Sequence, residues 1–229
     1  LDLSTDGSTK LDIVLASDFD QKREKWIKEP FDWLTSADLS ATGDKVVLTA
    51  RGQVFVAPVK DGRLVRTTRR DDVRYRRAVF MPNGDTVLVL SDESGEVEFW
   101  TVPANGVGEP AQLTDNGTIL RWEGIPSPDG KLIAYNDKNQ KLWVYDIARI
   151  RHTVLDSNLS WGLGDLAWSP DSRWLAAVGY AANRFQQIAV YNIEAGDKHF
   201  ITPDRFHSFS PTWSPDGEWL YFISDRNYG

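Results

Sequence analysis

A short turn-like phrase recurs along the chain and constrains the fold more than any other feature. Ser-Pro-Asp-Gly occupies residues 127–130 and 214–217, and Ser-Pro-Asp-Ser occupies residues 169–172. Weaker copies stand at residues 40–43 and 81–84. The second residues of these copies lie at positions 41, 82, 128, 170 and 215, a period of roughly 40 to 46 residues, which is the signature of a repeat architecture.

Each repeat contains four short apolar segments. In residues 164–202, strand-like runs occupy residues 166–168, 174–178, 187–193 and 199–202. The phrase between the first two runs favours a tight turn, because proline fixes a backbone angle and aspartate hydrogen-bonds the local backbone. Four antiparallel strands in roughly 40 to 45 residues are typical of one propeller blade. We therefore expect an all-β protein, a β-propeller of four-stranded antiparallel blades.

The period divides the chain into about five blade equivalents. We expect blades over residues 35–68, 76–114, 121–155 and 164–202, and a partial blade over residues 209–229. Residues 1–16 are expected to end a preceding blade, with a strand over residues 10–15. Residues 17–34 are expected to be a linker with a helical turn over residues 21–28.

Neither end of the chain reads as a natural start or stop, so we expect a segment of a longer protein and of a larger propeller. Two arrangements of the terminal half-blades stay open at this point. They join into a ring, or the blades form an arc with unpaired strand edges, which favour aggregation.

The charge balance excludes some classes of partner. The chain has 26 Lys and Arg against 33 Asp and Glu, a formal net charge of −7. This excess of acid argues against nucleic acid or an anionic membrane as the main partner. The chain has no cysteine, which excludes thiolate metal sites and disulfides. No histidine or acidic pair has metal-ligand spacing, and we expect no metal or cofactor.

Several segments, taken in order, resemble one known family. Residues 49–58 read TARGQVFVAP, residues 90–98 read LSDESGEVE, and residues 103–114 read PANGVGEPAQLT. Residues 164–176 (GDLAWSPDSRWLA) and 221–226 (YFISDR) follow. This ordered set, which covers essentially the whole chain, resembles the propeller region of tricorn proteases. Met81 in place of the turn serine, and Ile125-Pro126 where tryptophan commonly precedes the turn, depart from the pattern.

The resemblance implies further expectations. Tricorn proteases are large cytoplasmic serine peptidases of prokaryotes that assemble as hexamers and trim short peptides. Two propellers precede their catalytic region. The resemblance implies that this chain is most of the second propeller, with residues 1–15 ending the first, and that it filters and guides peptides to a distant active site. Expected partners are peptides, other domains of the parent chain and further subunits. The family's catalytic residues lie in later domains, so none carries over.

One basic cluster stands out from the acidic background. Seven arginines occur between residues 63 and 77, a span predicted to cover a fourth strand, a rim loop and a first strand that lines the channel. Guanidinium groups bind carboxylates bidentately and attract acidic ligands. The candidate peptide-steering residues are Arg70, Arg74, Arg76 and Arg77. The alternative is a solvated loop, or ion pairs with neighbouring blades or another subunit.

Two other functions stay open. The Ser-Pro-Asp-Gly turn is shared with a protein-interaction propeller of the periplasmic translocation type, and a prolyl-oligopeptidase-like enzyme carries a gating propeller. The latter predicts a Gly-x-Ser-x-Gly nucleophile motif in a part of the protein that follows this chain, and the absence of the motif here excludes such a hydrolase domain within the chain. His152, His199 and His207 are expected at the surface or at strand ends. Trp168 and Trp213, at the ends of first strands, are expected to pack between blades.

Overall fold

A computed structural model describes residues 12–14, 16, 26–157 and 162–226, and the chain divides into two compact units, residues 1–32 and 33–229. In the first unit, half of the predicted strand over residues 10–15 and most of the predicted helical turn over residues 21–28 lie outside the described residues. Residues 12–14 are described and do not form a strand. Residues 26–28 are described and are not helical. A short 3-10 helix, η2 (Pro30–Trp33), leads into the second unit.

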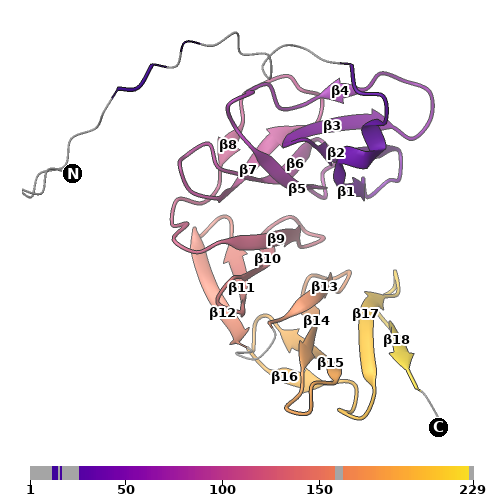
Figure 1. The fold of residues 1–229 in the computed structure, drawn as a ribbon. Coiled ribbons are helices and arrows are strands. Elements are labelled where there is room, and N and C mark those ends of the chain that lie inside the picture. Colours follow the sequence, from indigo (N-terminus) through magenta and orange to yellow (C-terminus); the bar gives the residue numbers. More distant parts are fainter. Residues whose placement is uncertain (1–11, 15, 17–25, 158–161, 227–229) are drawn as a thin grey trace, which may run out of the picture. The chain divides into compact units, whose positions relative to one another are not determined.

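The second unit consists of antiparallel sheets laid out in chain order (Figure 1). Blade 1 contains β1 (Leu34–Leu39), β2 (Lys45–Ala50), β3 (Gln53–Pro58) and β4 (Val65–Arg66). Blade 2 contains β5 (Tyr75–Phe80), β6 (Thr86–Ser91), β7 (Glu98–Pro103) and β8 (Ala111–Gln112). Blade 3 contains β9 (Arg121–Pro126), β10 (Leu132–Asp137), β11 (Lys141–Asp146) and β12 (Arg151–Ser157). Blade 4 contains β13 (Gly164–Trp168), β14 (Trp174–Tyr180), β15 (Gln186–Asn192) and β16 (Lys198–Phe200). Blade 5 contains β17 (His207–Trp213) and β18 (Leu220–Asp225).

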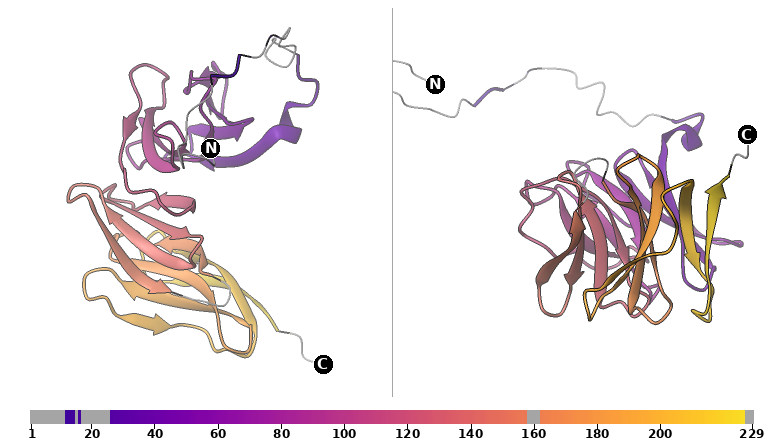
Figure 2. Two further views of the ribbon diagram at one scale, coloured as in Figure 1. Left: turned by 60° about the vertical axis from the view of Figure 1, so that its left-hand side comes forward. Right: turned by 90° about the horizontal axis from the view of Figure 1, so that it is seen from below.

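These sheets confirm the predicted all-β propeller fold. The blades of the second unit follow one another around a curved row that is open between blade 5 and blade 1, with the first strand of each blade on the inner side (Figures 1 and 2). First strands of neighbouring blades contact each other, β1 with β5, β5 with β9 and β13 with β17. Among the described strands, β18 pairs with β17 alone. Tyr221 and Ile223 on β18 are exposed.

The recurring phrase forms the same hydrogen-bonded turn between the first and second strands of three blades. In blade 4, Ser169 Oγ donates to Asp171 Oδ1 over 2.6 Å and accepts a hydrogen bond from Trp174 N over 2.9 Å. Ser127 and Ser214 make the corresponding contacts in blades 3 and 5. The repeated aspartates therefore stabilise the turns, as expected for this residue type.

Blade 2 makes this turn with different side chains. Met81 replaces the serine, and Asn83 Oδ1 accepts hydrogen bonds from the backbone N–H groups of Asp85 and Thr86 over 3.0 and 3.2 Å. The one side-chain oxygen of Asn83 thus accepts the two backbone hydrogen bonds that the serine and the aspartate accept separately in blades 3, 4 and 5. For this reason the departure at Met81 leaves the blade intact.

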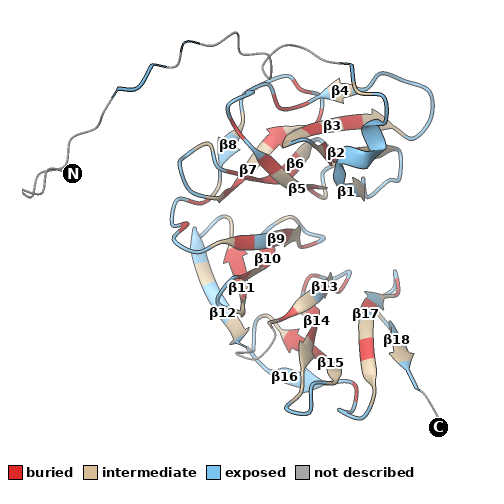
Figure 3. Cartoon of the chain, in the orientation of Figure 1, coloured by how far each residue is buried: buried red, intermediate tan, exposed pale blue. Residues whose placement is uncertain are grey.

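The hydrophobic core lies between the blades. Buried residues concentrate on the second and third strands (Figure 3) and form three clusters, between blades 1 and 2, blades 2 and 3, and blades 3 and 4. The predicted packing of Trp168 and Trp213 between blades is confirmed. Trp168 Nε1 donates to Ile125 O over 2.9 Å, and Trp213 Nε1 donates to Ala167 O over 3.1 Å. Each tryptophan thereby ties its first strand to the preceding blade.

Candidate functional site

The arginine cluster does not form one patch, because its members lie on different parts of two blades. Arg63 precedes β4 and lines a cavity of about 270 Å³ with Lys45 and Asp85, beside the turn that joins β5 to β6. Arg66 lies on β4, and Arg69 and Arg70 lie in the loop that leads to blade 2. Of the remaining three, Arg74 directly precedes the inner strand β5, and Arg76 and Arg77 belong to it.

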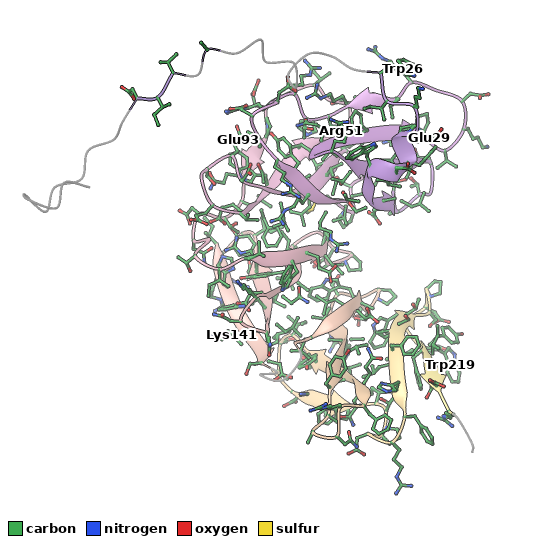
Figure 4. The ribbon with its side chains drawn as sticks, viewed as in Figure 1. Trp26, Glu29, Arg51, Glu93, Lys141 and Trp219 are labelled. Carbon is green, nitrogen blue, oxygen red and sulfur yellow. The ribbon has the colours of Figure 1, made fainter. Side chains whose placement is uncertain are left out.

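Arg70 forms ion pairs with two acidic residues. Its guanidinium contacts Asp72 Oδ2 and Glu93 Oε1, each over 2.8 Å. These partners raise the pKa of Arg70, and the hydrogen bond from Arg70 lowers the pKa of Asp72. Tyr75 Oη donates to Glu93 Oε2 over 3.2 Å, and burial, followed by the Glu93 charge, raises the Tyr75 pKa to about 12. Glu93, labelled in Figure 4, thus anchors the loop to the turn between β6 and β7.

Two other arginines, one on β4 and one in the loop, also have partners. Arg66 forms an ion pair with Asp71, and Arg69 Nη2 donates to Gly106 O over 2.8 Å. The Arg66–Asp71 pair is exposed, and exposed ion pairs add little stability. Both interactions do hold the loop in place.

The side chains of Arg74, Arg76 and Arg77 have no hydrogen bond or ion pair within the described part of the chain. The backbone N–H of Arg74 donates to Asp92 Oδ1 over 2.8 Å, which fixes the start of β5. Arg74 and Arg77 are exposed and Arg76 is half-buried. Of the four predicted residues, these three therefore present free charge at the inner strand, whereas Arg70 does not.

Every first strand has an irregular register at about the same height. The pairing of β5 with β6 shifts between Arg76 and Val79, and corresponding shifts occur in β1, β9, β13 and β17. Arg77, Asp165 and Ser210 lie inside three of these bulges with φ angles of 51°, 45° and 53°. All three are exposed. Blades 2 and 4 have a neighbouring blade on each face, which covers side chains that point to either face. An exposed side chain on the innermost strand of these blades therefore points toward the axis.

We call the residues at this position the bulge row. It consists of Arg77, Asp165 and Ser210, which lie inside bulges, and of Ser36 and Glu123, which directly follow the bulges of β1 and β9. Each lies the same number of residues before the turn. The sequence pattern did not reveal this row, because a bulge depends on register. Its one sequence signal is the constant distance from the second residue of the turn phrase.

Sequence reasoning also missed a buried ion pair between blades 2 and 3. Glu98 on β7 and Arg121 on β9 are 2% and 4% exposed, and Glu98 Oε2 lies 2.5 Å from Arg121 Nη1. Glu98 also accepts hydrogen bonds from Thr114 Oγ1 and Gly117 N, and Arg121 Nη2 donates to Asn116 Oδ1 over 2.6 Å. The pair has its hydrogen bonds satisfied and is structural, since it lies inside the blade junction. One feature of the sequence could have revealed this pair. Arg121 occupies the position, relative to the turn phrase, at which blades 2 and 4 have Tyr75 and Leu163.

Two of the three histidines, His152 and His207, make structural hydrogen bonds. His152 on β12 is half-buried, with Nδ1 2.9 Å from Tyr135 Oη and its ring stacked on Tyr145 at 4.5 Å. Burial, followed by the nearby Arg121 charge, lowers its pKa. His207 Nδ1 accepts a hydrogen bond from Gln186 N over 3.3 Å. His199 is exposed on β16.

The lowered pKa of His152 predicts a pH-dependent stability. Below the ordinary value of 6.5, the unfolded chain takes up a proton at His152 that the folded chain does not, so stability falls as pH falls. We expect urea unfolding between about pH 8 and pH 5.5 to show a smaller pH dependence in His152→Phe than in the native chain. His199→Phe is the matched control and should keep the native slope. Equal slopes in all three proteins would contradict the prediction.

Comparison with known proteins decides the family. The model of the tricorn protease second β-propeller domain matches residues 34–229. The chain belongs to the tricorn protease family. A tricorn-like protease C-terminal subunit of Sulfurisphaera tokodaii is 32% identical over 219 residues, which cover 95% of this chain and 24% of that protein. A tricorn protease homolog of Saccharolobus solfataricus is 29% identical over 227 residues, covering 99% of this chain and 20% of that protein. The chain thus spans a quarter or less of the length of these prokaryotic relatives.

Solved structures support the tricorn propeller fold. The crystal structure of the tricorn protease superposes with a TM-score of 0.71 at 18% identity, over 85% of this chain and 19% of that chain. A TolB-type protein of Agrobacterium tumefaciens gives a TM-score of 0.66 at 20% identity, over 84% of this chain and 70% of that one. At these identities the likeness shows the fold alone. Within the described ranges, no helix is long and apolar enough to span a bilayer.

Proposed function

We propose that this tricorn propeller forms a walled channel that filters short peptides and guides them to the active site of a cytoplasmic, hexameric serine peptidase. The observation that carries the proposal is the bulge row, in which Arg77, Asp165 and Ser210 are exposed polar or charged residues on the inner strands of a propeller of this family. A set of rigid blades with buried cores admits a narrow chain and excludes a folded domain. The first strands also have unpaired backbone edges, which bind extended peptides without reading their sequence.

Arg74, Arg76 and Arg77 are proposed to steer acidic peptides inward. They lie together at the start of one inner strand and lack partners within the described residues. Unpaired charges at the mouth of a channel raise the local concentration of oppositely charged ligands. Arg70 supports them indirectly, because its ion pairs with Asp72 and Glu93 hold the preceding loop.

The test of steering replaces Arg74, Arg76 and Arg77 with serine in the full-length protein. We expect kcat/KM at low salt to fall about three- to tenfold for acidic peptides blocked at both ends and to change little for neutral peptides blocked in the same way, since steering acts on charge. Salt should remove the difference, because ions screen exposed charges beyond about 10 Å. The control, Lys60, Arg63 and Arg149→Ser, removes equal charge from exposed connections between third and fourth strands. Equal changes for both peptides, or none, would rule out steering.

The TolB-type likeness favours a second candidate, a propeller that binds a protein partner rather than passing peptides. The two candidates predict different activities for the complete polypeptide. A peptide channel requires that a linear peptide is turned over faster than the same sequence inside a folded domain. A protein-binding propeller requires a stable complex with a folded partner and no peptide turnover.

A further inference from the structure

Charged residues of both signs lie at the same height on the inner strands of adjacent blades. Arg76 and Arg77 belong to β5, Glu123 belongs to β9 and Asp165 belongs to β13. The strands β5 and β9 contact each other. Even so, no ion pair joins either arginine to Glu123 in the part of the chain that the structure describes. The two signs of charge are therefore held apart on the inner side.

Asp165 is oriented by its neighbour. Its Oδ2 accepts a hydrogen bond from Ser210 N over 3.1 Å, which fixes the carboxylate between two inner strands. The residue is exposed, so Oδ1 remains open to a ligand. Trp122, beside Glu123, is 50% exposed and offers an apolar surface between the arginines of blade 2 and the carboxylate of blade 4.

We propose that the charged members of the bulge row, together with the adjacent Arg76, bind the two charged ends of a short peptide. Arg76 and Arg77 contact the terminal carboxylate, and Glu123 and Asp165 contact the terminal ammonium. This inference rests on the proposed peptide channel and adds the chemical class of its ligand, which is a zwitterionic peptide with free termini.

The charge pattern favours termini over side chains as the groups recognised. A row that selected acidic or basic peptides would carry one sign of charge, because like charges on the ligand would repel the other wall. Each free peptide carries one ammonium and one carboxylate whatever its sequence. Binding both ends therefore selects short free peptides through groups that every sequence carries, in addition to the steering of acidic peptides, whereas the interior of a longer chain offers neither group.

The experiment uses one neutral peptide sequence in four forms: free, amidated at its C-terminus, acetylated at its N-terminus, and blocked at both ends. The full-length protein carries Arg77→Asn or Asp165→Asn. Asparagine tolerates the left-handed backbone at both positions, and its amide oxygen keeps the bond to Ser210 N. The control is Ser210→Asn, which changes a residue inside a bulge (φ 53°) without removing charge. The readout is the ratio of kcat/KM between variant and native protein for each peptide.

We expect Arg77→Asn to lower kcat/KM about threefold for peptides with a free carboxylate and to leave amidated peptides unchanged, the size typical of an exposed ion pair. Asp165→Asn should lower it by a similar factor for peptides with a free ammonium alone. Equal losses for all four peptides would overturn terminus recognition while leaving the channel in place. No change for any peptide would also overturn it. If, in addition, folded substrates were turned over as fast as linear ones, the channel itself would be wrong.

Discussion

Replacing Gly124 with alanine is expected to lower the free energy of unfolding by about 2 to 3 kcal/mol, as overpacking of a filled core does. Gly124 lies on β9, where blade 3 meets blade 2. A Cβ atom there would lie 2.4 Å from Phe99 Cε1 and 3.2 Å from Ile133 Cγ2. Phe99 is completely buried, so its ring has no free space into which to move. Urea unfolding of the chain measures the change.

Two variants show whether the clash with Phe99 is the cause. Phe99→Leu shortens the side chain that Gly124→Ala would meet, so the double variant should lose less stability than the sum of the single losses. Gly164→Ala is the control on another inner strand, because nothing lies within 4 Å of its added Cβ. Strict additivity, or an equal loss from Gly164→Ala, would contradict the proposed packing.

Breaking the buried ion pair should have a still larger effect. Glu98→Gln or Arg121→Met leaves one charge uncompensated inside the junction of blades 2 and 3, which costs about 3 to 5 kcal/mol. The guanidinium of Arg121 also lies over the rings of Phe99 and Tyr135, 5.4 Å from each centroid. Few compensating rearrangements are therefore available. The measurement is the urea midpoint of each single variant and of the double variant.

The double variant separates the charge from the packing. Glu98→Gln with Arg121→Met has no buried charge, so it should recover much of the stability that either single change removes. Asp71→Asn, which breaks the exposed pair with Arg66, should leave the midpoint nearly unchanged. A native midpoint in Glu98→Gln would mean that the pair adds nothing to the junction.

The repeat was predictable from sequence because its determinants are local. A serine, a proline and an aspartate within four residues specify the turn, and the residues on either side specify the strands. Asn83 shows the limit of this reasoning. The turn at Met81 departs from the pattern in sequence and yet closes through a different side chain.

The candidate site was less predictable, because it depends on register and on contacts distant in sequence. Arginines of one short segment lie on different structural elements, since Arg63 precedes β4 and Arg77 lies on β5, beyond the loop that follows β4. Arg70 forms an ion pair with Glu93, which lies 23 residues away in the sequence. The partner of Arg121 is likewise 23 residues away, on another blade. No local pattern specifies such pairs.

The most direct test of a peptide path along the inner strands is to block it chemically. This chain has no cysteine, so Trp122→Cys, beside Glu123 of the bulge row, adds a single thiol to it on the inner side for a maleimide-linked polyethylene glycol. Val59→Cys, in the exposed connection from β3 to β4, is the control, and the unsubstituted full-length protein is treated alongside. We predict that labelling at residue 122 lowers peptide kcat/KM at least about tenfold, through loss of the binding and steering that the path provides, and that labelling at residue 59 leaves it unchanged. Equal turnover in the two labelled proteins would contradict a path through this propeller.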